Sequence, residues 1–138
     1  MQKPLVFMFP GQGSHYYQMG KTLYTQHIVF RYWLDKADKI ISKELGISIL
    51  ALIYNPVKNK SDEFSRTLYT HPAIFMVEYA LAQTLMAEGI YPDLVLGVSL
   101  GELVAASIAN ILTFEEALHA VIKQAQYFER CCLPGKML

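Results

Sequence analysis

Residues 93–107 read DLVLGVSLGELVAAS, and this stretch decides the expected fold. The apolar run before Gly97 predicts a strand, and the small residues after Gly101 predict a helix. Between them, Ser99 stands in the pattern G-x-S-x-G, which is typical of a sharp turn from a strand into a helix. We therefore expect an α/β protein in which the hydroxyl of Ser99 projects from the carboxyl end of a mainly parallel sheet.

This arrangement, a nucleophile elbow, gives three neighbouring positions a role. Side chains at Gly97 and Gly101 would collide with the adjoining strand and helix, so both positions favour glycine. The helix that follows begins with free backbone N–H groups and with the positive end of its dipole. The N–H of Leu100 is therefore expected to donate to the oxyanion that forms when Ser99 attacks a carbonyl carbon.

The rest of the chain predicts one more clear strand and several helices. Residues 5–9 predict a buried strand of a parallel sheet, and a loop with two glycines follows it. Helices are expected at 27–44 (with apolar residues Ile28, Tyr32, Ile40 and Ile41), 47–54, 72–88, 102–110 and 113–130. The other segments are expected as a strand at 94–96, a polar surface segment around a short helix at 57–70, and an extended end at 133–138.

These elements do not make a complete domain. Two strands cannot form a sheet that buries this much helix, because a parallel sheet is normally covered on both faces. The chain also stops where a further strand is expected to begin. We interpret residues 1–138 as the N-terminal part of a larger α/β domain, whose missing strands come from further residues or from a second chain.

The composition narrows the classes of function. Of the 138 residues, 53% are hydrophobic and 17% are charged, and the formal net charge is zero. This argues against a nucleic-acid partner, which needs clustered Lys and Arg, and no apolar run is long enough to span a membrane. No signal peptide is recognisable. The adjacent Cys131 and Cys132 have neither disulfide nor metal-ligand spacing, so we expect no metal site. Taken together, these features lead us to expect a soluble cytoplasmic protein that uses no cofactor.

Three motifs add a resemblance to a known family. FPGQGS at 9–14, THPAIF at 70–75 and GVSLGE at 97–102 occur in the order found in the malonyl-CoA:acyl-carrier-protein acyltransferase family. The chain resembles the first half of such a domain. It is similar above all to the acyl hydrolases that accompany trans-acyltransferase polyketide synthases.

The resemblance implies an α/β-hydrolase-like core and a ferredoxin-like subdomain that is not in this chain. Ser99 would carry the acyl group as an ester, and the backbone N–H of Gln12 would join that of Leu100 in the oxyanion hole. An acyl carrier protein and an acyl thioester of phosphopantetheine or coenzyme A would be the partners. The general base would be a histidine beyond residue 138, since the family's position is held by none of His15, His27, His71 and His119.

Two positions near the expected site differ from the family. Val98 stands where the family has a histidine beside the nucleophile, which makes a substrate-pocket wall more apolar; a neutral change at a core-facing position is the alternative. His71 stands where the family has glutamine, so it could contact substrate or water. A satisfied histidine in a loop or helix cap is the interpretation we favour for His71.

A third difference bears on the substrate. Malonyl-specific members carry an arginine that binds the malonyl carboxylate, and alignment of the last helix puts Gln124 at that position. The capping-box spacing of Thr113 and Glu116 fixes the start of this helix, which argues against an alignment shifted by one turn. A neutral amide cannot form the bidentate, charge-assisted pair of a guanidinium, and Lys123 points about 100° away on the helix.

These residues lead to one hypothesis with two alternatives. Without the arginine, the pocket suits neutral acyl chains, and water can compete for the acyl ester. We expect an acyl-carrier thioester hydrolase that removes stalled acyl groups in polyketide biosynthesis. The first alternative is an acyltransferase that loads malonyl or another acyl unit onto a carrier protein. The second is a non-catalytic fragment or docking module, because the general base is absent.

Overall fold

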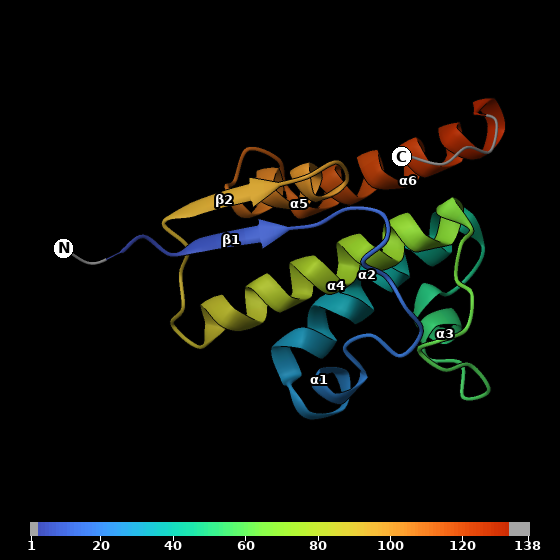
Figure 1. Ribbon diagram of the computed structural model, residues 1–138, viewed down its shortest axis with the longest axis horizontal. Helices are drawn as coiled ribbons and strands as arrows, with labels where there is room; N and C mark the ends of the chain where they lie inside the picture. The colour runs from blue at the N-terminus through green and yellow to red at the C-terminus, as the bar shows by residue number, and fades with distance from the viewer. Residues whose placement is uncertain (1–2, 133–138) are drawn as a thin grey trace.

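The computed structural model describes residues 3–132, which form a small parallel sheet packed with helices (Figure 1). In chain order the elements are β1 (Val6–Phe9), α1 (Lys21–Gln26), α2 (Ile28–Leu45), α3 (Ile49–Ile53), α4 (Thr67–Ala87), β2 (Leu94–Gly97), α5 (Gly101–Ile108) and α6 (Phe114–Cys131). Both predicted strands are present, and they pair in parallel as expected.

The register of the sheet brings the two strand ends level. Phe9, the last residue of β1, is paired with Gly97, the last residue of β2. The pairing continues one step further, because the N–H of Val98 donates to the carbonyl of Phe9 at 3.0 Å. The loop after β1 and the turn after β2 therefore leave the same edge of the sheet.

The sheet is covered on one face only among residues 3–132. Phe7 and Phe9 are buried, whereas Met8 between them is 72% exposed, as alternation along a strand requires. Leu94 and Leu96 of β2 are also exposed. The expectation of a buried strand at 5–9 is thus correct for Phe7 and Phe9 and wrong for Leu5, Val6 and Met8, which are exposed.

Helix α4 is the central helix of the fold. It packs against α2 and α6, and Figure 1 shows it running alongside β1. It begins at Thr67, five residues earlier than the sequence predicts, and Pro72 lies inside it. A proline there removes one backbone hydrogen bond of the early turns. The side chains of Thr70 and His71, which belong to this extra segment, are buried.

The ends of α2 and α6 agree with the sequence. Gly46, in the left-handed conformation, terminates α2. At the start of α6, the N–H of Glu116 donates to Thr113 Oγ1 at 3.2 Å, and the N–H of Thr113 donates to the Glu116 carboxylate at 2.8 Å. The predicted capping box is therefore confirmed, and with it the register of the helix that carries Gln124.

Other details differ from the expectation. Helix α1 was not expected, and residues 57–66 contain turns but no helix, which corrects the short helix expected at 57–70. The buried stripe of α2 is not formed by Ile28 and Tyr32, which are exposed; its members are Phe30, Leu34, Ala37 and Ile41. The predicted extended end at 133–138 lies outside the described residues.

No helix within residues 3–132 has the length and apolar character needed to cross a membrane. Over the same residues, no cluster of three or more His, Cys, Asp or Glu side chains could hold a metal ion.

Candidate active site

Ser99 sits in a strained turn between β2 and α5. Its backbone φ is 55°, in the left-handed region that residues other than glycine rarely adopt. The turn is closed by two hydrogen bonds of 3.0 Å, from the N–H of Gly101 to the carbonyl of Val98 and from the N–H of Glu102 to the carbonyl of Ser99. The side chain of Ser99 is exposed at the carboxyl end of the sheet. The strand, turn and helix that the sequence predicts are all in place.

Both glycines of the motif are required by close backbone packing. A β-carbon on Gly97 would overlap the carbonyl of Gly101, and one on Gly101 would overlap the carbonyl of Phe9. The end of β1, the turn and the first turn of α5 therefore lie backbone against backbone. This packing holds Ser99 in its strained conformation.

The loop after β1 reaches the serine turn. A β-carbon on Gly11 would lie 2.9 Å from the carbonyl oxygen of Val98 and 3.5 Å from the backbone nitrogen of Leu100. The backbone of Gln12 follows directly. Among the described residues, neither the N–H of Gln12 nor that of Leu100 donates to a protein acceptor. Two free donors thus stand close to Ser99, which is what stabilisation of an oxyanion needs.

The side chain of Gln12 is held by α4. The hydroxyl of Thr70 donates to Gln12 Oε1 at 3.0 Å, and Thr70 is fully buried. Sequence reasoning assigned no role to Thr70. The one feature of the sequence that could have indicated a role for Thr70 is its position as the first residue of the THPAIF motif.

His71 lies next to Thr70, inside α4 and 6% exposed. Its ring meets that of Phe128 edge to face, with centroids 5.9 Å apart. Burial lowers the pKa of His71, and the charge that His15 gains when it is protonated would act in the same direction. Nδ1 of His71 has no hydrogen-bond partner within residues 3–132. The favoured interpretation of His71 as a satisfied loop or cap residue is therefore wrong.

Helix α6 packs against α4 beside His71. Gln124 and Lys123 are both exposed, and Phe128, which touches His71, lies one turn after Gln124 on the same face of the helix. Sequence reasoning missed Phe128, although its spacing of four residues from Gln124 would have indicated it. Val98 is 62% exposed, so its side chain does not face the core as the alternative interpretation supposed.

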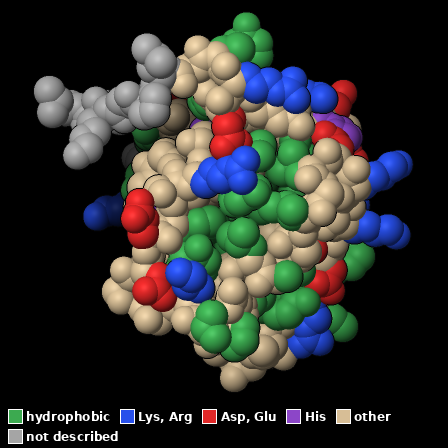
Figure 2. All heavy atoms as spheres, turned by 90° about the vertical axis from the view of Figure 1, so that its right-hand side faces the viewer, with side chains coloured by type: hydrophobic (Ala, Val, Ile, Leu, Met, Phe, Trp, Pro, Cys, Tyr) green, Lys and Arg blue, Asp and Glu red, His purple; other side chains and the backbone are tan. Residues whose placement is uncertain are grey.

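The strands point toward one face of the molecule. Figure 2 shows this face, with hydrophobic side chains gathered among scattered charged ones. Three large apolar side chains are exposed: Val98, in the turn that contains Ser99, and Tyr127 and Phe128, in α6. Such a surface suits an apolar ligand better than a charged one.

The other three histidines have partners away from Ser99. His15 accepts a hydrogen bond at Nδ1 from the N–H of Gly13 and donates one from Nε2 to the carbonyl of Phe64, so its ring is neutral. His27 contacts Glu88, and His119 contacts Glu44. Within residues 3–132, no imidazole is hydrogen-bonded to the Ser99 hydroxyl.

Comparison with known proteins identifies the family. The profile described as "Acyl transferase domain" matches residues 6–138. Over its full length the chain is 48% identical to the polyketide biosynthesis acyltransferase homolog PksD of Bacillus subtilis, covering 43% of that protein. It is 31% identical over 96% of its length to the malonyl CoA-acyl carrier protein transacylase of the same organism, covering 39% of that protein.

A solved structure gives the same result for the fold. The acyl transferase domain of ZmaA superposes with a TM-score of 0.86 at 33% identity, over 97% of this chain and 31% of that one. The predicted acyltransferase-type α/β core is thereby confirmed. The chain spans less than half the length of the curated relatives it matches. By its sequence and its fold, the chain belongs to the acyl transferase domain family.

Proposed function

We propose that this chain is the nucleophile-bearing part of an enzyme that hydrolyses acyl-carrier thioesters in polyketide biosynthesis. The observation that carries the proposal is the left-handed backbone of Ser99, held between two packed glycines and beside the loop of Gln12. Strain of this kind persists only where surrounding structure enforces it, and it gathers at active sites. The biosynthetic context comes from the name of PksD, the relative that is 48% identical.

The first half of the reaction transfers the acyl group to the protein. Ser99 Oγ attacks the thioester carbonyl, its proton passes to a general base outside residues 3–132, and a C–O bond forms. The oxyanion accepts hydrogen bonds from the N–H groups of Gln12 and Leu100. When the tetrahedral intermediate collapses, the C–S bond breaks and the thiol leaves with a proton, so that an ester remains on Ser99.

The second half decides between hydrolysis and transfer. Gln124, an exposed neutral amide on α6, cannot form a charge-assisted bidentate pair with a malonyl carboxylate. Acyl groups without a carboxylate are therefore expected to bind, and water is expected to attack the ester. Water adds its oxygen to the carbonyl carbon, the bond to Ser99 breaks, and a free carboxylic acid is released.

Transfer to a carrier protein is the second candidate function. It is favoured by the 31% identity to the malonyl CoA-acyl carrier protein transacylase of Bacillus subtilis. In this case the thiol of an acyl carrier protein, rather than water, would attack the ester on Ser99. The two functions share every step up to the acyl-enzyme and differ in the product.

A docking role without catalysis is the third candidate function. It follows from the described histidines, since three have other partners and none is bonded to Ser99. If the complete protein supplies no base, the hydroxyl of Ser99 stays a poor nucleophile.

The test uses the complete protein with acetyl-, longer acyl- and malonyl-carrier proteins as substrates. Mass spectrometry separates free acid from acyl carrier protein, and the Ser99→Ala variant serves as the control. We expect free acid from the neutral substrates, with a rate that falls about 10³-fold or more in the Ser99→Ala variant. Malonyl transfer at a comparable or higher rate would favour the transferase, and an unchanged rate in the variant would exclude Ser99 as the nucleophile.

A further inference from the structure

Three exposed lysines, Lys21, Lys58 and Lys60, have no ion-pair partner within residues 3–132. Lys21 is the first residue of α1, and the other two lie in the loop between α3 and α4. The carboxylates that follow in this loop, Asp62 and Glu63, accept hydrogen bonds from neighbouring loop residues instead. We call the surface formed by the three lysines the lysine surface. Its positive charge is not neutralised by an ion pair in this part of the chain.

Each of these lysines lies over the ring of a tyrosine. The distances from Nζ to the ring centroid are 5.3 Å for Lys21 over Tyr54, 5.7 Å for Lys58 over Tyr17 and 4.6 Å for Lys60 over Tyr16. Such cation–π contacts restrain a side chain that is otherwise long and flexible. The ammonium groups therefore have preferred positions before a partner arrives, which lowers the conformational entropy lost on binding.

Gln18 joins the two segments that carry these pairs. Its side-chain amide donates to the carbonyls of Asn55 at 2.7 Å and of Lys58 at 2.9 Å. Its backbone N–H donates to the carbonyl of Ile53 at 2.8 Å. The φ of Gln18 is 67°, in the left-handed region, and strain of this kind persists where surrounding structure enforces it and gathers at functional sites. The lysine surface is thus held in one fixed arrangement.

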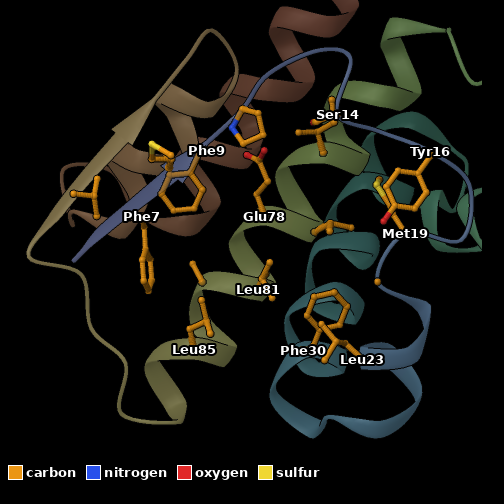
Figure 3. Close-up of a pocket in the computed structure, with 17 residues that line it drawn as sticks. Phe7, Phe9, Ser14, Tyr16, Met19, Leu23, Phe30, Glu78, Leu81 and Leu85 are labelled. Atoms are coloured by element: carbon orange, nitrogen blue, oxygen red, sulfur yellow. The ribbon is translucent and has the colours of Figure 1, made fainter.

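The lysine surface adjoins the loop that carries the proposed oxyanion donor. Tyr16 and Tyr17 follow Gln12 in the same loop, and Figure 3 shows Tyr16 on the stretch that continues from the end of β1. The loop between α3 and α4 is fixed to this stretch, because the ring of Tyr17 stacks on that of Phe64 with centroids 4.7 Å apart. In Figure 1 this loop lies toward the end of the molecule to which β1 points. Ser99 is exposed at the same end of the sheet.

We infer that the lysine surface docks carboxylate side chains of the acyl carrier protein that delivers a thioester to Ser99, an inference that rests on the proposed function. Hydrolase and transferase alike take the acyl group from a carrier protein, so the surface serves either reaction. Ammonium groups attract carboxylates on a partner, speed the encounter and fix the orientation in which the two proteins meet. The surface therefore recognises the protein that carries the acyl group rather than the acyl chain.

A coenzyme A thioester fits the lysine surface less well. Binding of a phosphate favours donors that converge on one anion, such as the fork of an arginine or successive backbone N–H groups. Here the three ammonium groups stand over three separate rings. Separate carboxylates on the surface of a protein match this arrangement better than one phosphate does.

The first experiment compares three acyl donors with the complete protein. The donors are an acyl carrier protein, acyl-coenzyme A and the uncharged acyl thioester of N-acetylcysteamine, and the measured quantity is the second-order rate constant for formation of the acyl ester on Ser99. The variant combines Lys21→Gln, Lys58→Gln and Lys60→Gln. The control combines Lys3→Gln, Lys39→Gln and Lys123→Gln, which removes the same charge at exposed positions elsewhere.

We expect the variant to lower the rate constant about tenfold for the carrier protein and to leave the other two donors unchanged. The rate with the small thioester also shows that the variant is folded. An equal fall for the carrier protein in variant and control would overturn the inference, because net charge alone would then explain the effect. A fall of the same size with acyl-coenzyme A would overturn it too, since the lysines would then bind phosphate.

The second experiment measures binding and needs no turnover. Isothermal titration calorimetry gives the Kd of the carrier protein for the complete Ser99→Ala protein, with and without the three substitutions of the lysine surface. We expect these substitutions to weaken binding about tenfold and to make the Kd less dependent on salt. An unchanged Kd would overturn the docking surface. If no donor forms an acyl ester on Ser99, the proposed function fails, and the Kd still decides whether the lysines bind the carrier protein.

Discussion

The hydroxyl of Thr70 donates a hydrogen bond of 3.0 Å to the side-chain oxygen of Gln12. These residues are 58 positions apart in the sequence, and the bond ties the loop after β1 to the central helix α4. The loop in turn touches the turn of Ser99 through Gly11. A fully buried threonine therefore positions the backbone N–H that the proposed mechanism assigns to the oxyanion.

Removing this hydroxyl should slow the reaction more than it destabilises the protein. For Thr70→Val in the complete protein, we expect the rate of acyl-enzyme formation to fall about tenfold, the effect of a misplaced oxyanion donor. Thr84→Val is a matched control, because Thr84 is also buried in α4 and donates to the carbonyl of Ala80 at 2.7 Å. Both variants should lose about 1 kcal/mol of unfolding free energy. Equal rates in the two variants would contradict the positioning role of Thr70.

The packing of the elbow predicts a large effect at Gly101. An added methyl group would overlap the carbonyl of Phe9, so we expect Gly101→Ala to lower the free energy of unfolding by about 3 kcal/mol or more. Gly46→Ala is the control: φ at Gly46 is +73°, and no atom lies near the added methyl group. Its cost should stay at about 1–2 kcal/mol, the cost of the left-handed backbone alone. Urea denaturation measures both, and similar losses would argue against the close packing.

An arginine at position 124 should change the substrate preference. The guanidinium can pair with a malonyl carboxylate, so Gln124→Arg in the complete protein is expected to raise the rate of malonyl loading on Ser99 about tenfold or more. Lys123→Arg places the same group one position away on the exposed side of α6 and should leave this rate unchanged. Mass spectrometry of the intact protein detects the malonyl ester. If both variants gain equally, Gln124 does not face the acyl group.

The environment of His71 predicts a dependence of stability on pH. Its pKa in the folded protein lies below the ordinary value of 6.5, chiefly because of burial. The unfolded chain therefore binds more protons than the folded one as the pH falls through 6.5, and the free energy of unfolding falls with it. For His71→Gln, we expect a smaller loss of stability between pH 7.5 and pH 5.5 than for the original chain. An equal loss in both proteins would contradict the burial of a neutral imidazole.

The sequence was sufficient where a structural requirement is local. The pair of glycines around Ser99 predicts the elbow because only glycine allows the backbone contacts found there. The spacing of Thr113 and Glu116 likewise predicts the start of α6, since both hydrogen bonds form within four residues. These two features fix the backbone turn at Ser99 and the start of the helix that carries Gln124.

The sequence was insufficient where distant segments decide the structure. Pro72 was interpreted as the first residue of a helix, but tertiary burial of Thr70 and His71 extends α4 back to Thr67. In α2, Ile28 and Phe30 are both apolar, and packing against the other helices determines which one is buried. Helix α1 has six residues and none of them is buried, so it shows no periodic pattern that could predict it.

The fate of the acyl group on Ser99 tests the central claim most directly. The complete protein is mixed with a carrier protein that bears a neutral acyl group, in water enriched in ¹⁸O, and the products are weighed by mass spectrometry. The account predicts a transient acyl ester on Ser99, followed by a free carboxylic acid that contains one ¹⁸O atom. Acyl groups that pass from Ser99 to a second carrier protein without appearing as free acid would contradict it.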